Sequence, residues 1–302
     1  MAKIIAECIP NFSEGRNEKI ISALVREASS VPGAALLDFS SDPSHNRSVC
    51  TLLGQLESLG EAAFRLCRLA SELIDLNCHA GEHPRMGATD VIPFIPVKGA
   101  GMAECIEMSK AVASRIWNEL KIPVFLYELS ASCPDRKDLS NVRKGQFEGM
   151  PKKLLEPSWA PDFGKREIHS TAGVTAVGAR MPLIAYNINL STSDLSIAKA
   201  IAKAVRGSSG GYAFCKAIGI MLTERNTAQV SMNMVNFEAT PLYRVQEAVR
   251  AEAKRWGVSI IGSELIGLSP SKALLDVAAY YLQIENFDSE KQIIENRLLQ
   301  ME

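Results

Sequence analysis

The chain has 302 residues, 47% hydrophobic and 22% charged, with a formal net charge of -1. These are ordinary globular values, and they argue against a disordered or fibrous chain. A net charge so close to zero argues against a broad surface for nucleic acid or for an anionic membrane, so we expect neither as a partner.

The first half of the chain alternates short β-rich runs with longer amphipathic stretches. The expected strands are 3–8, 34–39, 48–54, 91–97 and 123–127. The expected helices are 18–29, 56–76 and 102–120. The run VIPFIPV at 91–97 contains two prolines, which lack the N–H of a ladder hydrogen bond. We therefore expect an edge strand or an irregular one at this position.

Residues 128–181 are rich in proline and glycine, and they predict a long ordered connection with one helix near 138–148. Trp159, Phe147 and Phe163 within it favour packing over disorder. Connections of this length in compact proteins are commonly functional when they are ordered.

The second half repeats the pattern of the first. The expected strands are 183–190, 213–222, 228–237 and 258–265, and the expected helices are 193–206, 240–256, 270–282 and 287–301. The order β-α-β-β-α-β is the ferredoxin-like arrangement. We therefore predict an α+β fold of two ferredoxin-like subdomains, spanning 1–180 and 181–302.

The chain contains seven cysteines and no Cys-x-x-Cys pair, which indicates neither a disulfide framework nor a zinc ribbon. We expect reduced thiols that pack as small hydrophobic side chains. No signal peptide and no run of about 18 apolar residues is visible. Together these features predict a cytoplasmic protein.

Two of the four histidines lie in the segment His79-Ala-Gly-Glu82-His83-Pro84-Arg85-Met86-Gly87. Its first five residues match H-x-x-E-H, a zinc-peptidase signature that requires a helix. A proline pushes the preceding residue out of the α region, so His83 is not expected to be helical. A zinc hydrolase that uses His79, Glu82 and His83 is thus the weaker alternative.

The alternative that we favour is a rigid loop that projects His83 and Arg85 into a cleft. A histidine titrates near neutral pH, so His83 is a candidate general acid and base. Glu82 is a candidate to orient the ring or hold its charge. The competing, purely structural interpretation is a turn in which His83 bonds a backbone carbonyl.

Five long strings resemble the formiminotransferase domain of the formiminotransferase–cyclodeaminase family. They are CIPNFSEGRN at 8–17, GEHPRMGATDVIPFIPV at 81–97, WAPDFG at 159–164, LIAYNINL at 183–190 and GSELIGLSPSKALLD at 262–276. The resemblance runs from about residue 3 to about residue 300. It implies two ferredoxin-like subdomains with a substrate cleft or tunnel between them.

The resemblance implies transfer of the formimino group from N-formimino-L-glutamate to tetrahydrofolate. The products are 5-formiminotetrahydrofolate and L-glutamate, in histidine degradation. The catalytic histidine of the family falls on His83. Its folate-binding segment falls on Gly164, Lys165, Arg166, Glu167, Ile168, His169, Ser170, Thr171, Ala172 and Gly173. Tetrahydrofolate is then a co-substrate, no metal is expected, and the chain is expected to form a homodimer.

Both implied substrates are anions, and arginine is suited to bidentate binding of carboxylates. Arg85 is the first candidate, and Arg47 is a weaker one. Asn11 and Ser13, which follow the first strand, are possible polar contacts. Three alternatives stay open: formyl transfer at the same site, the zinc hydrolase, and a non-catalytic folate-binding or assembly protein.

Overall fold

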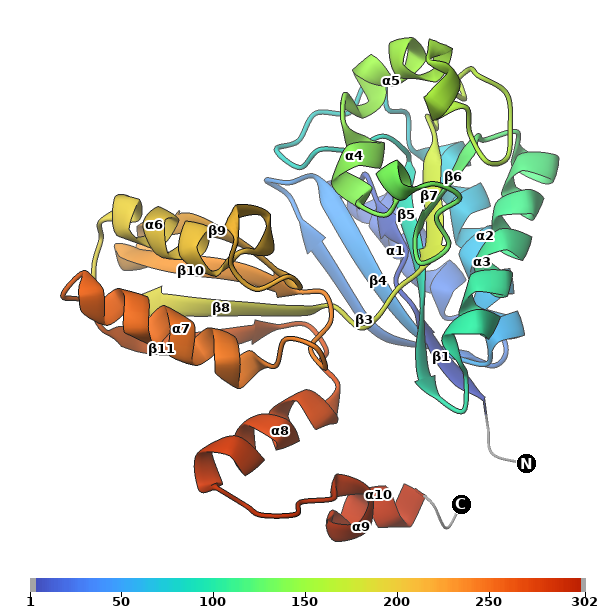
Figure 1. The fold of residues 1–302 in the computed structure, drawn as a ribbon. Helices are drawn as coiled ribbons and strands as arrows, with labels where there is room; N and C mark the ends of the chain where they lie inside the picture. The colour runs from blue at the N-terminus through green and yellow to red at the C-terminus, as the bar shows by residue number, and fades with distance from the viewer. Residues whose placement is uncertain (1–3, 300–302) are drawn as a thin grey trace. The chain divides into compact units, whose positions relative to one another are not determined.

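The computed structural model describes residues 4–299, and the chain divides after Arg180 into two compact units. Each unit combines one β-sheet with α-helices, which confirms the α+β class (Figure 1). Among the helices of residues 4–299, none is long and apolar enough to cross a membrane. The expected strand 3–8 and the expected helix 287–301 extend past the described range, at residue 3 and at residues 300–301.

The first unit contains a seven-stranded sheet. Its strands are β1 (Ile5–Cys8), β2 (Asn11–Phe12), β3 (Ala34–Asp42), β4 (Arg47–Gly54), β5 (Thr89–Lys98), β6 (Val124–Glu128) and β7 (Thr175–Ala179). Its helices are α1 (Glu18–Ala28), α2 (Leu56–Leu73), α3 (Met102–Arg115), α4 (Leu139–Arg143) and α5 (Gln146–Leu155). Both β1 and β2 pair antiparallel with β4 and β5, whereas β7 pairs parallel with β5 and β6.

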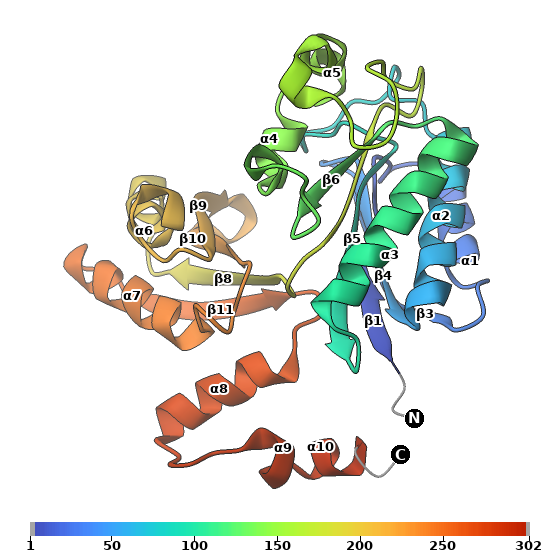
Figure 2. The same cartoon turned by 45° about the vertical axis from the view of Figure 1, so that its right-hand side comes forward.

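Helices α1, α2 and α3 lie side by side along one face of this sheet (Figure 2). The side chain of Asn17 caps α1 by accepting the backbone N–H groups of Lys19 and Ile20. In β6, Leu126 joins the core beneath these helices, whereas Phe125 joins a second cluster together with Val142 of α4. The sheet is therefore buried on both faces near β6, and α4 and α5 cover the face opposite to α1–α3.

The sequence predicted either an edge strand or an irregular strand at 91–97, and the second alternative is confirmed. Strand β5 is irregular, with register shifts opposite β1 and β2, but it lies inside the sheet rather than at its edge. The prolines are tolerated because a proline keeps its carbonyl: Pro93 O accepts the N–H of Ile9 at 3.2 Å. The edge alternative does not hold, because it considered only the missing donor.

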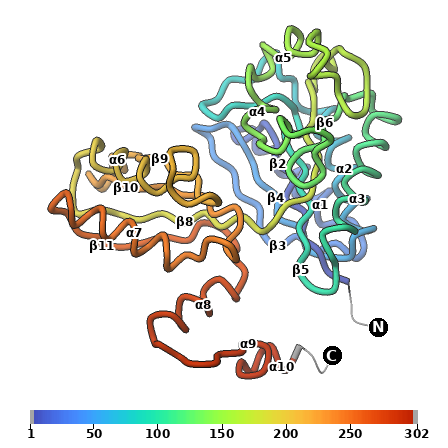
Figure 3. Tube along the Cα trace, in the orientation of Figure 1, coloured from blue at the N-terminus to red at the C-terminus, as the bar shows by residue number. Residues whose placement is uncertain are grey.

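The connection 128–181 contains more structure than the sequence predicted. The single helix expected at 138–148 is two helices, α4 and α5, separated at Gly145 with φ of 94°. The chain leaves β6, passes through both helices, and returns as β7 beside β6 (Figure 3). All five residues of β7 are buried, and its sequence TAVGA has no alternation that would mark it as a strand.

The second unit contains a four-stranded antiparallel sheet in the order β11-β8-β10-β9. Its elements are β8 (Ile184–Leu190), α6 (Leu195–Val205), β9 (Cys215–Leu222), β10 (Thr227–Met234), α7 (Leu242–Arg255), β11 (Ile260–Ile266), α8 (Ser271–Leu282), α9 (Ser289–Gln292) and α10 (Ile294–Leu299). Helices α6 and α7 share a core with the sheet that includes Ile188, Val230 and Val249. The helix expected at 287–301 is interrupted at Ile293, which separates α9 from α10.

We expect Gly173→Ala to destabilise the first unit. Gly173 has φ of 69°, and a Cβ there would lie 2.2 Å from the carbonyl oxygen of Met86. Overpacking alone costs about 1–3 kcal/mol, and the positive φ adds strain. Gly149→Ala is the control, because its Cβ would meet no atom within 4 Å and it lies inside α5. That control is expected to gain about 0.5–1 kcal/mol in urea unfolding. Equal stability of the two variants would contradict this prediction.

Candidate active site

The loop that carries His83 is not helical, as the sequence predicted from Pro84. It is fixed to the turn between β3 and β4 by backbone and side-chain contacts. The backbone N–H of Glu82 donates to Ser44 O at 3.2 Å, and Asn46 Nδ2 donates to Ala80 O at 3.0 Å. These bonds hold the backbone on the N-terminal side of His83.

The His83 side chain is half-buried and lies among polar groups. Its Nδ1 lies 3.1 Å from Arg47 Nη1, and its ring lies 6.2 Å from that of His45, centroid to centroid. A guanidinium only donates, so Nδ1 must be the acceptor, and the proton of the neutral ring is on Nε2. The ring therefore bonds the Arg47 guanidinium, and the Pro84 backbone also acts on it.

Asp90 organises the charges around this ring. It is fully buried in β5, and its Oδ2 accepts from Arg47 Nη1 at 3.2 Å and from Arg143 Nη2 at 2.6 Å. The backbone N–H of Met86 donates to Oδ1 at 2.9 Å. One carboxylate thus holds two guanidinium groups, and together they carry one excess positive charge. We call Arg47, Asp90 and Arg143 the charge cluster.

The charge cluster changes the protonation of its neighbours. Burial, with Arg47 and Arg143 nearby, lowers the pKa of His83 to about 4, so the ring is neutral at pH 7. Burial alone would raise the pKa of Asp90, but Arg143, Arg47 and the Met86 N–H together hold it below its usual range. The site therefore combines a neutral imidazole with an ionised carboxylate.

Arg85 does not extend toward His83, contrary to the expectation of a shared cleft. Its Nη1 and Nη2 donate to the two carboxylate oxygens of Glu148 at 2.9 and 2.7 Å, and its Nε donates to His79 Nδ1 at 3.0 Å. Arg85 is buried, and this network fixes the loop to α5. A bidentate partner already occupies the fork that we had assigned to a substrate carboxylate.

The zinc-hydrolase alternative fails on the geometry of His79. Its Nδ1 accepts from Arg85, and its Nε2 lies 2.9 Å from Asn46 O, so the neutral ring has no free lone pair. Glu82 is exposed, and within residues 4–299 its carboxylate makes no hydrogen bond to His83. In the described part of the chain, no group of three or more His, Cys, Asp or Glu side chains could hold a metal ion.

Of the weaker candidates, Arg47 belongs to the charge cluster and Asn11 bonds it. Asn11 is buried in β2, and its Oδ1 accepts from Arg47 Nη2 at 2.5 Å. Ser13 braces the loop instead, because its Oγ donates to Gly87 O at 2.8 Å. Sequence reasoning missed Arg143 in α4, because only the fold brings this arginine beside β5.

The expected folate segment, residues 164–173, lies against the same loop. Its first part is exposed at Lys165, Arg166 and Glu167, whereas Ala172 and Gly173 are buried. The backbone N–H of Ala88 donates to Ala172 O at 3.0 Å, and Val174 N donates to Met86 O at 3.0 Å.

His169 closes the turn of this segment. It exchanges two backbone hydrogen bonds with Gly173, at 2.9 and 3.0 Å, and its Nδ1 accepts the N–H of Ala172 at 3.1 Å. Burial lowers the pKa of the His169 ring. The structure thus places the turn that His169 closes next to the end of the His83 loop, although the two are far apart in sequence.

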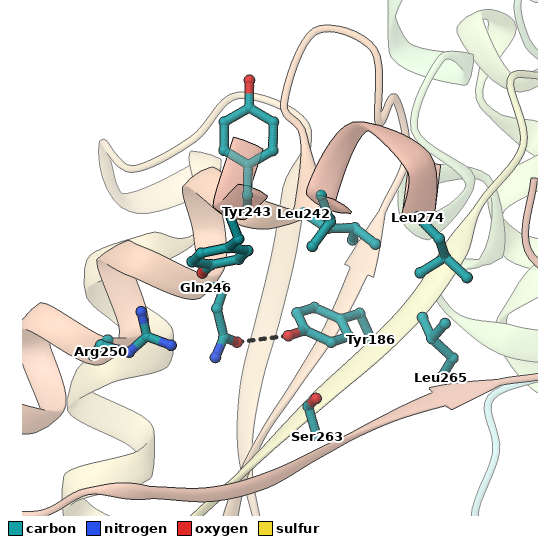
Figure 4. Close-up of a pocket in the computed structure, with 10 residues that line it drawn as sticks. Tyr186, Leu242, Tyr243, Gln246, Arg250, Ser263, Leu265 and Leu274 are labelled. Carbon is teal, nitrogen blue, oxygen red and sulfur yellow. Dashed lines mark hydrogen bonds between the residues drawn. The ribbon is translucent and has the colours of Figure 1, made fainter. Parts of the chain in front are cut away.

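The second unit has a separate pocket of about 440 Å³ between β8, β11, α7 and α8 (Figure 4). Tyr186 Oη donates to Gln246 Oε1 at 2.6 Å at its polar end, and Arg250 is paired with Glu247. Leu265 and Leu274 line the opposite, apolar end. None of the residues that the sequence singled out for chemistry lines this pocket.

The fold and the site define an α+β protein in which a neutral histidine adjoins a charged arginine–aspartate cluster. Residues 5–180 match the family described as the formiminotransferase domain, N-terminal subdomain, and residues 185–301 match the formiminotransferase domain. This chain belongs to the formiminotransferase family.

Three relatives show how widely this similarity extends. The glutamate formimidoyltransferase of Streptococcus pyogenes serotype M1 is 64% identical, over 99% of this chain and 100% of that protein. The protein of that name from Thermoplasma acidophilum is 44% identical, over 97% of each chain. The formimidoyltransferase-cyclodeaminase of Mus musculus is 46% identical over 93% of this chain, which spans 53% of that longer protein.

Proposed function

We propose that this chain is a glutamate formimidoyltransferase that transfers the formimino group from N-formimino-L-glutamate to tetrahydrofolate. The names of its full-length relatives support this activity. The observation that carries the catalytic proposal is the position of His83. Its neutral ring accepts from Arg47, and the end of its loop bonds the expected folate segment.

The reaction needs a group that both takes and gives a proton. A folate nitrogen attacks the formimino carbon, a C–N bond forms, and the attacking nitrogen must lose a proton. The C–N bond to glutamate then breaks, and the leaving nitrogen must gain a proton. One imidazole can do both in sequence, which is typically worth about 10²–10⁴ in rate. His83 is the catalytic residue of this proposal.

The remaining candidates take supporting roles. Arg85 bonds both His79 and Glu148 and so positions the loop. Asn11 positions Arg47. Glu82 lies at the exposed edge of the loop, where its carboxylate favours the protonated, more electrophilic form of the amidine.

Residues 164–173 contact folate, with Lys165 and Arg166 available for its carboxylates. Tetrahydrofolate is a co-substrate, and no metal takes part. The ring that a zinc site would need is bonded through both nitrogens.

Several finer expectations belong to this proposal. The β-α-β-β-α-β order and the strand order β11-β8-β10-β9 support a ferredoxin-like second unit. All seven cysteines are free, which fits a reducing cytoplasm. The substrate cleft that the family resemblance implies stays a prediction, and so does the expected homodimer.

The proposed function is tested by mixing the purified chain with N-formimino-L-glutamate and tetrahydrofolate. We expect equimolar 5-formiminotetrahydrofolate and L-glutamate, and the same rate after treatment with a zinc chelator. A parallel assay with N-formyl-L-glutamate tests formyl transfer at the same site. Loss of turnover on chelation, or turnover of the formyl donor alone, would overturn the proposal.

A further inference from the structure

Arg143 has hydrogen-bond donors that the protein does not use. Its Nη2 bonds Asp90, but its Nε is buried without a partner, and its Nη1 makes no hydrogen bond within residues 4–299. The side chain is only 14% exposed. Leaving a buried donor without an acceptor is costly, so this arrangement indicates that an acceptor from outside the chain completes it.

The charge of the site identifies the kind of acceptor. Arg47 and Arg143 both bond one oxygen of Asp90, so a single carboxylate faces two guanidinium groups. A second carboxylate would balance the remaining positive charge and would match the planar donor fork of arginine. The other buried arginines are more fully paired. Arg85 is paired with Glu148. Arg136 also has a buried Nε without a partner, but both of its terminal nitrogens are bonded, to Asp162, to Ser132 and to two carbonyl oxygens.

We propose that a carboxylate of the amino-acid substrate binds at Arg47 and Arg143, and that Arg143 sets the preference for a dicarboxylate. This inference rests on the proposed function and adds a specificity residue to it. Arg143 is one residue from Lys144, which lines a different cavity of about 500 Å³. Arg143 and Lys144 are neighbouring cations, so replacing each in turn gives a matched comparison.

The same contact has a consequence for proton transfer. In the free protein, Arg47 occupies His83 Nδ1, the nitrogen that has the lone pair. A carboxylate that draws Arg47 toward itself releases Nδ1 to accept the proton of the attacking nitrogen. Arg47 and Arg143 favour the neutral ring, Asp90 opposes them, and the His45 ring lies at its edge. Substrate binding therefore makes His83 a stronger base when one is needed.

The test compares Arg143→Lys and Arg143→Gln with Lys144→Gln. We expect both Arg143 variants to raise KM for N-formimino-L-glutamate about 10- to 100-fold, the usual range for a lost charge-assisted hydrogen bond. KM for tetrahydrofolate should change less than about twofold, and Lys144→Gln should leave both values unchanged. Arg143→Lys keeps a charge beside Asp90, so its thermal midpoint should stay close to that of the wild type.

A binding measurement separates this inference from the proposed function. Calorimetry with L-glutamate needs no turnover, and it should show weaker binding to both Arg143 variants and unchanged binding to Lys144→Gln. If the wild type transfers the formimino group but the Arg143 variants keep KM and glutamate affinity, the inference fails and the function stands. If the wild type has no turnover yet glutamate binding depends on Arg143, the carboxylate site stands and the function fails.

Discussion

His83→Ala is expected to lower kcat by about 10²–10⁴ while the variant stays folded. The imidazole is the group of the site that can take a proton from one nitrogen and return it to another near neutral pH. Its ring is half-buried and its side-chain partner is Arg47, so removing it leaves no buried carboxylate without a partner. The measurement is the rate of 5-formiminotetrahydrofolate formation at saturating concentrations of both substrates.

His45→Ala is the matched control for His83→Ala. It removes a second imidazole whose ring lies 6.2 Å from that of His83, but this one is exposed and paired with Asp42. We expect its kcat to stay within about threefold of the wild type, because substitutions of exposed side chains usually have small effects. Wild-type turnover by His83→Ala would remove His83 from the mechanism.

The pH dependence provides a second readout for His83. Its pKa in the folded protein is about 4, below its ordinary value, so kcat/KM should fall only as the pH drops through about 4. At a pH between the ordinary pKa of histidine and about 4, the His83 ring is protonated in the unfolded chain and neutral in the folded chain. The free energy of unfolding therefore falls as the pH drops through that range. His83→Ala should lose less of its free energy of unfolding over the same range.

Local backbone rules predicted much of the fold around the site. Pro84 excluded a helix at His83, and the helix expected at 18–29 is α1. Strand β7 was missed because a short run buried on both faces shows no period of two. The position of β5 depends on the strands that pair with it, β1, β2 and β7, and these are set by tertiary pairing rather than by its own sequence.

The site was harder to predict than the fold, because its contacts join distant segments. His83, Arg47 and Asn11 were named from the sequence, and the structure brings them together. Arg143 follows from no spacing rule, since only the packing of α4 brings it to β5. Arg85 was assigned to substrate because Glu148, its actual partner, lies 63 residues further along the chain.

Asp90→Ala is expected to destabilise the first unit by about 3–5 kcal/mol, the usual cost of breaking a buried ion pair from one side. Asp90 is fully buried and accepts from two arginines and one backbone N–H. Without it, two largely buried guanidinium groups face each other with no counter-charge. Urea unfolding followed by circular dichroism measures the change, with Glu82→Ala as an exposed carboxylate control expected within about 0.5 kcal/mol.

A double variant separates lost charge balance from lost packing. In Asp90→Leu with Arg143→Met, one positive and one negative charge are removed together, and apolar volume takes their place. Replacing a buried pair in this way is often neutral or stabilising, so the double variant should be more stable than Asp90→Ala. Arg47 remains without its carboxylate, so the recovery should be partial. If the double variant is as unstable as Asp90→Ala, the contribution of Asp90 is packing. Its burial would then not be explained by the charges of the two arginines.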